Sequence, residues 1–476
     1  MNGYRPTIGL EVHAELTTRT KMFCDSPNAP HEAAANTNVC PICMAHPGTL
    51  PVANKEAVHQ VLRVGTAING TLADFTEFDR KSYFYPDIPK GYQISQYEFP
   101  LVKGGVLEGV EITRIHLEED TARSSHDNAT GKSLVDFNRA GVPLMELVTE
   151  PVIHDAETAG RFARELQLLL RTLGASHANL EKGEMRIEAN ISVSKTDTFG
   201  TKVEVKNLNS FRSVERAIAY EVERQSKLLD EGGVVTQETR GWDEGKQQTF
   251  SQRVKEGAAD YRYFPEPDLP KMNISEIPEF ALETLKAGLP ELPWERRARY
   301  AALGLKPDAC AYLADGISRG VFFDALTQKL GGDEALIALA ANYLISDVAG
   351  WYTKQGVSEY ENFSPATFAK LIELIGNGSL SSRGAKDVLL LILEGDAREP
   401  EVIAKEKGLV QVSDPEALRA SVREVMGQQE AAVVEYRAGK EAALQFLVGQ
   451  TMKATKGAGN PATLRTLLLE ELAKGE

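Results

Sequence analysis

Acidic and imidazole side chains alternate with apolar ones close to the N-terminus of this 476-residue chain. Glu11, His13 and Glu15 share one side of an expected strand, because successive side chains of a strand point to opposite faces. Leu10 and Val12 lie on the other, core-facing side. A single strand whose polar side faces solvent would show the same alternation, so this pattern alone does not establish a site.

The pattern recurs in later segments. Residues 185–193 carry Arg186, Glu188 and Asn190 on one side, residues 201–207 carry Glu204 and Lys206, and residues 111–120 end in His116-Leu117-Glu118-Glu119-Asp120. Carboxylates on neighbouring strands repel one another and need a cation. Carboxylates with an imidazole suit Mg²⁺ or Mn²⁺, which prefer oxygen ligands and leave room for phosphate oxygens. The sequence therefore predicts a divalent-cation site on one face of a sheet.

A segment rich in aromatic and basic residues spans residues 78–96. Pro86 and Pro89 exclude a helix there, so we expect a rigid loop that presents Lys81, Lys90 and several tyrosines. An aromatic-packed loop with solvated lysines is one interpretation. Beside a cation site, the lysines can instead hold a phosphate or a reacting carboxylate.

Composition narrows the class of protein. A chain of this length usually forms two to four domains, and its 42% hydrophobic residues suffice for their cores. No apolar run approaches the roughly 20 residues of a membrane span, and the N-terminus lacks a signal-peptide pattern. We therefore expect a cytoplasmic protein without a membrane segment. The net charge of −15 argues against a general nucleic-acid coat, although local basic patches can still bind RNA.

The order of expected elements predicts an α+β fold. Up to about residue 265, strand-like and helix-like segments alternate. Proline-rich turns follow at residues 265–270 and 289–294, and the remaining pattern is almost wholly helical.

Seven segments spread along nearly the whole chain carry a family resemblance. They are residues 8–13 (IGLEVH), 84–87 (FYPD), 92–96 (YQISQ), 206–211 (KNLNSF), 260–268 (DYRYFPEPD), 436–440 (YRAGK) and 452–457 (MKATKG). Together they resemble the B subunit of the aspartyl/glutamyl-tRNA amidotransferase family. The resemblance implies a cradle-like catalytic domain with a mainly antiparallel sheet over residues 1–293. It also implies a helical domain over residues 294–405 and a helical tRNA-binding tail over residues 406–476.

The resemblance implies an ATP-dependent reaction on a misacylated tRNA, Asp-tRNA(Asn) or Glu-tRNA(Gln). A phosphoryl group from ATP activates the side-chain carboxylate, because oxide is a poor leaving group and phosphate is a better one. Ammonia released from glutamine by an amidase subunit then gives the amide. Mg²⁺ would neutralise the phosphate charge. The expected assembly is a heterotrimer with the amidase (A) subunit and a small C subunit.

Site residues follow from the same resemblance. Glu11, His13, Glu119, Glu188 and Glu204 are expected to bind Mg²⁺, with Glu118 as the alternative to Glu119 because adjacent strand residues face opposite ways. Glu188 stands where related sequences have Asp. Glu11 and His13 are also expected to be catalytic, together with Lys81 and Lys90, which resemble residues along the ammonia path. Tyr83, Lys206, Asn207 and Ser210 are expected to bind the nucleotide.

Cys24, Cys40 and Cys43 raise the question of a structural zinc ion. Four cysteines are too few for a disulfide framework in a chain of this size, and Cys40-x-x-Cys43 has the spacing of a metal knuckle. Relatives with a zinc knuckle have a Cys-x-Cys pair first, but here Cys24 is followed by Asp25 and Ser26. Asp25, His31 or His46 could complete a four-ligand site. The alternative is a knuckle that has lost its metal and is held by packing.

Four basic residues of the tail, Arg437, Lys440, Lys453 and Lys456, are candidates for tRNA phosphate contacts, although a solvated helix face explains each one nearly as well. Two other function classes stay open at this point. One is a tRNA-binding scaffold without chemistry of its own, and the other is an ATP-dependent activator of a different carboxylic acid.

Overall fold

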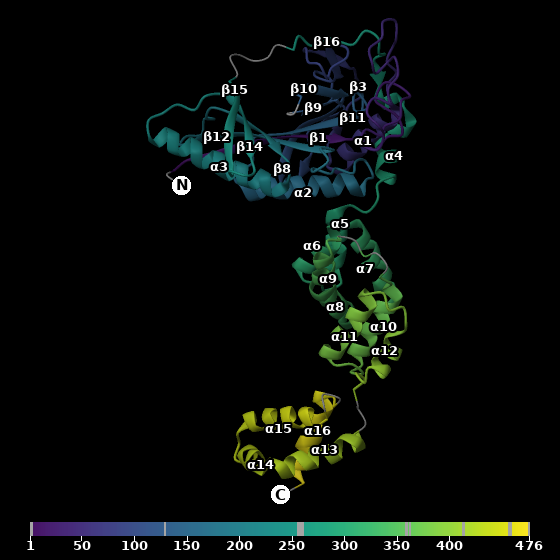
Figure 1. The fold of residues 1–476 in the computed structure, drawn as a ribbon, viewed down its shortest axis with the longest axis vertical. Helices are drawn as coiled ribbons and strands as arrows, with labels where there is room; N and C mark the ends of the chain where they lie inside the picture. The colour runs from purple at the N-terminus through teal and green to yellow at the C-terminus, as the bar shows by residue number, and fades with distance from the viewer. Residues whose placement is uncertain are drawn as a thin grey trace. The chain divides into compact units, whose positions relative to one another are not determined.

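The computed structural model describes residues 3–127, 130–254, 261–357, 360, 363–411, 415–455 and 459–474 (Figure 1). Of the motif residues named above, 260 and 456–457 lie outside this set. The chain divides into two compact units, Met1–Pro293 and Trp294–Glu476. The first unit contains the sheets and the second is helical, so the α+β prediction is confirmed.

A ten-stranded sheet forms the centre of the first unit. In spatial order its strands are β15 (Gln248–Val254), β14 (Glu238–Asp243), β13 (Val203–Leu208), β12 (Met185–Ser194), β1 (Arg5–Glu15), β11 (Pro143–Thr149), β8 (Val110–Glu119), β6 (Val102–Lys103) and β2 (Thr71–Leu72), and β7 (Val106–Leu107) also pairs with β8. Only β13 and β14 pair in parallel. The sheet is therefore mainly antiparallel, and β1 lies in its middle.

Helices cover one face of this sheet. Figure 1 shows α2 (Ala156–Thr172) and α3 (Phe211–Asp230) along that face, and α1 (Lys55–Ala67) packs near β2, β6 and β8. The alternate residues Leu10 and Val12 of β1 and Ile187 of β12 are almost fully buried. Because side chains alternate along each strand, this apolar packing leaves the opposite face for the charged residues.

Three smaller sheets stand beside the large one. The first contains β16 (Phe264–Pro265), β4 (Asp79–Ser82) and β5 (Tyr92–Ser95), the second β9 (Arg123–Asp127) and β10 (Lys132–Asp136), and the third β3 (Phe75–Thr76) and β17 (Met272–Asn273). The segment 78–96 is thus strand, loop and strand, with Pro86 and Pro89 in the loop. Short helices, η1 (Ile274–Glu276), η2 (Pro278–Phe280) and α4 (Leu282–Ala287), follow before the second unit.

The second unit contains two separate apolar clusters. One runs from Tyr300 to Ala404 and is built by α5 (Pro293–Ala302), α6 (Pro307–Ala314), α7 (Ile317–Lys329), α8 (Glu334–Tyr343), η3 (Leu344–Val348), α9 (Ala349–Gln355), α10 (Pro365–Gly376), α11 (Ser382–Leu393) and α12 (Pro400–Glu406). The other runs from Leu418 to Leu472 and is built by α13 (Pro415–Gln428), α14 (Glu430–Arg437), α15 (Glu441–Ala454) and α16 (Pro461–Ala473). The domain boundary near residue 405 stays a prediction.

Among the described residues, Glu334–Gln355 is the one helical stretch that is long and apolar enough to cross a membrane by length and composition. It comprises α8, the π-helical turn η3 and α9. Ile337, Leu344 and Val348 of this stretch are buried in the larger apolar cluster. A core helix passes the same test, so the stretch is weak support for a membrane span.

Candidate active site

Strand register brings acids and imidazoles side by side on the face opposite α2 and α3. Glu11 of β1 pairs with Glu188 of β12, and His13 pairs with Glu146 of β11. Glu146 in turn pairs with His116 of β8. Directly opposed residues of antiparallel strands lie within contact distance. Four adjacent strands therefore contribute to one charged patch.

Ligand atoms gather in three overlapping groups on this face. The groups are Glu11, His13 and Glu146; His116, Glu118 and Glu146; and Glu11, Glu188 and Glu204, and within each group the atoms lie within 4.8 Å of one another. Carboxylates at such distances repel in a buried setting unless a cation lies between them. Carboxylate oxygens with imidazole nitrogens are a donor set that fits Mg²⁺ or Mn²⁺.

Electrostatics on this face show how crowded the acids are. Burial, together with the charge of Glu146, raises the pKa of Glu11. Burial lowers the pKa of His13, but its hydrogen bond with Glu146 and the charges of Glu146 and Glu118 outweigh this and raise that pKa to about 9. Lys206 Nζ lies 2.8 Å from Glu188 and 3.5 Å from Glu204. Protonated His13 and Lys206 thus offset part of the negative charge of these acids, and a cation bound by His13 would displace its proton.

The patch forms the floor of a cavity of about 560 Å³. Besides the acids and histidines, its lining includes the basic residues Lys81, Arg114, Arg139, Arg186, Lys202 and Lys206. Arginine and lysine next to a carboxylate-rich centre can bind phosphate oxygens. Two buried imidazole nitrogens, Nδ1 of His13 and Nδ1 of His116, have no hydrogen-bond partner. The other ring nitrogen, Nε2, is the one beside the acids: it lies 3.4 Å from Glu146 in both His13 and His116, so Nε2 is the atom that would bind a cation there.

The structure separates Glu118 from Glu119. Glu118 lines the cavity and belongs to one of the three ligand groups, and Ser95 Oγ donates a hydrogen bond to it. Glu119 lies in none of these groups. Its carboxylate accepts a hydrogen bond from the Ile94 N–H and lies 2.5 Å from Lys90 Nζ. The alternation of β8 therefore places Glu118, rather than the expected Glu119, beside the other acids.

The two lysines of segment 78–96 line different cavities. Lys81 lines the large cavity, with its Nζ 4.0 Å from Glu118. Lys90 lines a second cavity of about 220 Å³ together with Glu119, Cys24 and Cys43. A narrow pocket lined by Gln93, Lys90 and Glu119, among others, adjoins both, because Gln93 also lines the large cavity.

The expected nucleotide-binding residues fall into two sets. Tyr83 and Lys206 line the large cavity, and the Tyr83 hydroxyl donates to Gln93 Oε1. Asn207 and Ser210 do not line it. Asn207 is exposed, with a φ of 64° at a register shift between β12 and β13, a conformation that asparagine tolerates better than most residues. Ser210 is the N-cap of α3 and accepts a hydrogen bond from the Ser213 N–H.

Glu146 and His116 are the site residues that sequence reasoning missed. Glu146 is the one acid in the otherwise uncharged strand β11, and it is buried. A lone buried carboxylate requires a partner, and that was the available signal. His116 lies two residues before Glu118, a spacing that places both on the same face of β8.

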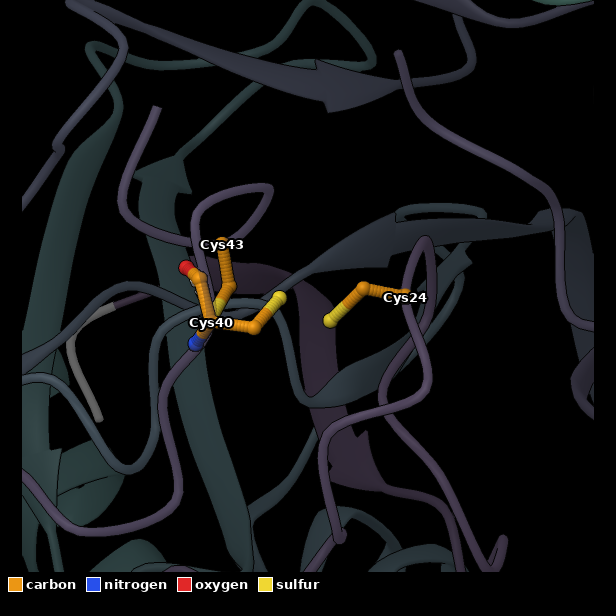
Figure 2. A group of neighbouring side chains, drawn as sticks. All are labelled: Cys24, Cys40 and Cys43. Atoms are coloured by element: carbon orange, nitrogen blue, oxygen red, sulfur yellow. Dashed lines mark hydrogen bonds between the residues drawn. The ribbon is translucent and has the colours of Figure 1, made fainter. Parts of the chain in front are cut away.

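Three cysteines form a second group in the first unit. The sulfur atoms of Cys24, Cys40 and Cys43 lie within 4.8 Å of one another, and Figure 2 shows the three side chains turned toward a common region. The Cys40 N–H lies 3.1 Å from Cys43 Sγ, and the Nζ of fully buried Lys21 lies 3.7 Å from it. The hydrogen bond from the Cys24 thiol, with these two groups, lowers the pKa of Cys43 to about 4, and the same hydrogen bond, together with burial, raises the pKa of Cys24.

None of the three expected fourth ligands joins this group. Asp25 is exposed, and His31 lies 3.4 Å from Glu15 in a hydrogen bond. His46 lines the smaller cavity with Cys24 and Cys43 but is not among the atoms within 4.8 Å. Ser26, at the position of the missing cysteine, has its Oγ 3.8 Å from Cys43 Sγ. Three thiol groups therefore fit a zinc ion, and the fourth ligand is the weak part of the fit.

The tail residues have local partners. Arg437 donates to the Leu472 carbonyl, and Lys440 pairs with Glu435 at 3.1 Å. Lys453 is in the last turn of α15, and Lys456 lies outside the described residues. Their role in RNA binding stays a prediction.

Comparisons with known proteins place the chain in a family. The family model described as the GatB/GatE catalytic domain matches residues 6–278, and the model described as the GatB domain matches residues 322–472. Residues 6–278, which include the strands of the acid-rich cavity, thus match a GatB/GatE catalytic domain, and a GatB domain follows them.

Full-length relatives agree with these matches. The chain is 46% identical to the B subunit of the aspartyl/glutamyl-tRNA(Asn/Gln) amidotransferase of Thermus thermophilus, over 99% of this chain and 100% of the relative. It is 45% identical to the protein of the same name from Thermomicrobium roseum, over 98% and 99% of the two chains. It is 42% identical to the B subunit of the chloroplastic/mitochondrial glutamyl-tRNA(Gln) amidotransferase of Oryza sativa, over 99% and 88%. The chain belongs to the family of amidotransferase B subunits, which are tRNA-dependent carbon–nitrogen ligases.

Proposed function

We propose that this chain activates the side-chain carboxylate of Asp-tRNA(Asn) or Glu-tRNA(Gln) with ATP and then converts it to the amide. The observation that carries the proposal is the convergence of acids and imidazoles from β1, β8, β11 and β12 on one cavity that also contains basic side chains. The acids fit Mg²⁺, which would neutralise phosphate charge when bound. Phosphoryl transfer needs this combination of cation ligands and phosphate-binding side chains.

In this proposal each residue has a defined task. Glu11, His13, Glu188 and Glu204 hold Mg²⁺, with Glu118 and Glu146 in place of Glu119. Lys206 and Tyr83 face the nucleotide phosphates, and Lys81 holds the reacting carboxylate near Glu118. Lys90 lies on the path by which ammonia arrives, through the smaller cavity. The ammonia comes from an amidase A subunit, and a small C subunit completes a cytoplasmic heterotrimer.

Substitution of Glu11 tests this proposal. In the reconstituted complex, Glu11→Gln is expected to abolish amide formation and to leave glutamine hydrolysis by the amidase subunit intact, because a carboxamide is a weaker cation ligand than a carboxylate. The matched control is Glu111→Gln, which changes an exposed glutamate of β8 outside the cavity. Full amide formation by Glu11→Gln would refute the assignment.

A label experiment separates the enzyme from a scaffold. With γ-labelled ATP and misacylated tRNA, the label is expected in an acyl phosphate when ammonia is withheld. If no label reaches the aminoacyl group, the chain binds tRNA without activating it. If label appears on another acid and not on the tRNA, the substrate class is wrong.

We further propose that Cys24, Cys40 and Cys43 bind one structural zinc ion. The support is the close approach of three sulfurs and the low pKa of Cys43, since thiolate is the ligand form. Metal analysis of the full chain is expected to find about one zinc per chain, lost in Cys43→Ser. Ser26→Cys is expected to tighten binding, and Cys310→Ser, which changes a cysteine of the second unit, is the control. Zinc content unchanged in Cys43→Ser would exclude the site.

A further inference from the structure

Four tyrosines form a continuous wall on one side of the large cavity. The members of this tyrosine wall are Tyr83, Tyr261, Tyr263 and Tyr97, and all four line the cavity. The ring centres of Tyr83 and Tyr261 are 5.9 Å apart, and those of Tyr261 and Tyr263 are 6.1 Å apart. Tyr263 and Tyr97 are stacked, with centres 4.5 Å apart and planes at 13°. Tyr83 is assigned above to the nucleotide phosphates, and the other three rings have no role in the proposed function.

The small sheet of β16, β4 and β5 holds the wall in place. Tyr83 follows β4, Tyr97 lies two residues after β5, and Tyr261 and Tyr263 precede β16. The Ser82 N–H donates to the Tyr261 carbonyl, and the Tyr97 N–H donates to Asp79 Oδ2, each at 2.9 Å. The rings are therefore preorganised, and little conformational entropy would be lost when a planar ligand binds.

The wall has an inner and an outer end. Near the inner end, Lys81 Nζ lies 5.2 Å from the centre of the Tyr261 ring and 4.0 Å from Glu118 Oε2. At the outer end, Tyr97 is 59% exposed although one face of its ring is against Tyr263. A tyrosine held by its backbone and stacked on one side offers its other face as a platform for a flat group.

We propose that the tyrosine wall is a stacking site for the terminal nucleobase of the aminoacylated RNA, with Tyr97 as its outer platform. Bases of single-stranded RNA ends are recognised mostly by stacking on aromatic side chains. This inference rests on the proposed function, because it takes the reacting carboxylate to be attached to that terminal nucleotide.

The exposed outer end of the wall favours the RNA base over the adenine of ATP. Lys81 lies between the Tyr261 ring and Glu118, and Tyr97, which is 59% exposed, lies two rings farther along the wall. In the aminoacylated RNA, ribose and the amino acid separate the base from the reacting carboxylate. In ATP, ribose and the whole triphosphate separate adenine from the transferred phosphorus. A terminal nucleotide with its base on Tyr97 can direct its RNA strand toward solvent and its amino acid along the wall toward Lys81 and Glu118.

Kinetics of the reconstituted complex test the proposal with Tyr97→Ala and Tyr97→Phe. Tyr97→Ala is expected to raise the KM for misacylated tRNA about tenfold and to leave the KM for ATP unchanged, because loss of one base–aromatic stack weakens binding by that order. Tyr97→Phe keeps the ring and is expected to stay close to the parent protein. Phe84→Ala is the control, since Phe84 is 77% exposed in the same region but does not line the cavity.

A second experiment removes the terminal nucleobase of the tRNA and keeps the Tyr97 ring. With a chemically aminoacylated tRNA that lacks only its terminal base, the parent protein is expected to show the raised KM, and Tyr97→Ala is expected to add nothing to it. The proposal is wrong if Tyr97→Ala leaves the KM for misacylated tRNA unchanged. It is also wrong if Tyr97→Ala raises the KM for the tRNA without its terminal base as much as it raises the KM for intact misacylated tRNA. A rise in the KM for ATP alone would assign the wall to adenine of ATP and also overturn it. Failure of the proposed function is distinguishable, since the parent protein would then form no amide with either RNA.

Discussion

Two lysine–glutamate pairs flank the end of β8, and they differ in how well their charges are balanced. Glu119 Oε1 lies 2.5 Å from Lys90 Nζ and also accepts a hydrogen bond from the Ile94 N–H, so this oxygen has two partners beside the smaller cavity. Glu118 lies 4.0 Å from Lys81 and shares the larger cavity with Glu146 and His116. Neighbouring residues of one strand thus serve two sites. What distinguishes the proposed cation site is the close approach of acids from several strands, and a single glutamate paired with a lysine does not have this feature.

Replacement of Glu118 or of Glu119 with glutamine is expected to reveal the largest difference between the two cavities, which is a difference in activity and in Mg²⁺ dependence. Glu118→Gln is expected to lower kcat for amide formation on the order of 100-fold or more and to raise the Mg²⁺ concentration required, because it removes a cation ligand. Glu119→Gln is expected to leave the Mg²⁺ dependence unchanged. Mg²⁺ titrations of both variants in the complex measure this. If only Glu119→Gln raised the Mg²⁺ concentration required, Glu119 would be the ligand, and the proposed difference between the two cavities would be wrong.

Replacement of Lys90 or Lys81 with methionine is expected to lower the free energy of unfolding by different amounts. Lys90→Met leaves the carboxylate of Glu119 buried beside an apolar chain, which is expected to cost about 3 kcal/mol of unfolding free energy at pH 7. Lys81→Met should cost less, about 1 kcal/mol, because Glu118 keeps Ser95 Oγ, His13 and His116 as partners. Urea unfolding of the full chain, with hydrogen exchange of β8, is the measurement. Lys90→Met combined with Glu119→Gln should recover part of the loss, and equal losses for the two lysines would contradict this account.

A third acid–base pair, His31 with Glu15 at the end of β1, should give the smallest effect. The hydrogen bond with Glu15 raises the pKa of His31, while partial burial opposes it. Because the folded pKa exceeds the unfolded value, the pair stabilises fully below the unfolded pKa of about 6.5 and ceases to do so as the pH rises through the folded pKa. His31→Gln should therefore cost at most about 1 kcal/mol at pH 6 and less at pH 9. Urea unfolding at both pH values checks this, and an NMR titration of His31 gives its pKa. A larger loss at pH 9 would exclude the mechanism.

The alternation of β1 made the acid-bearing face of the sheet predictable in outline. Glu11, His13, Glu188 and Glu204 were expected on one face because the period of two is a local property of the chain, and the structure brings them to one cavity. Glu146 was missed because it stands alone in an apolar strand, and only its pairing with His13 and His116 shows what it does. Asn207 and Ser210 were expected at the nucleotide from a linear motif. In the structure neither lines the cavity; Asn207 lies at a register shift and Ser210 caps a helix, and their role at the nucleotide stays a prediction.

The sequence by itself determined the α+β class, the acid-bearing strands and the family. These depend on local periodicity and on long motifs, both of which can be read without knowing which strands are neighbours. Only the tertiary structure decided between Glu118 and Glu119, assigned Lys81 and Lys90 to different cavities, and arranged four tyrosines into one wall. Each of these depends on strand order and register, since contacts between segments far apart in the chain arise only when the sheet has formed.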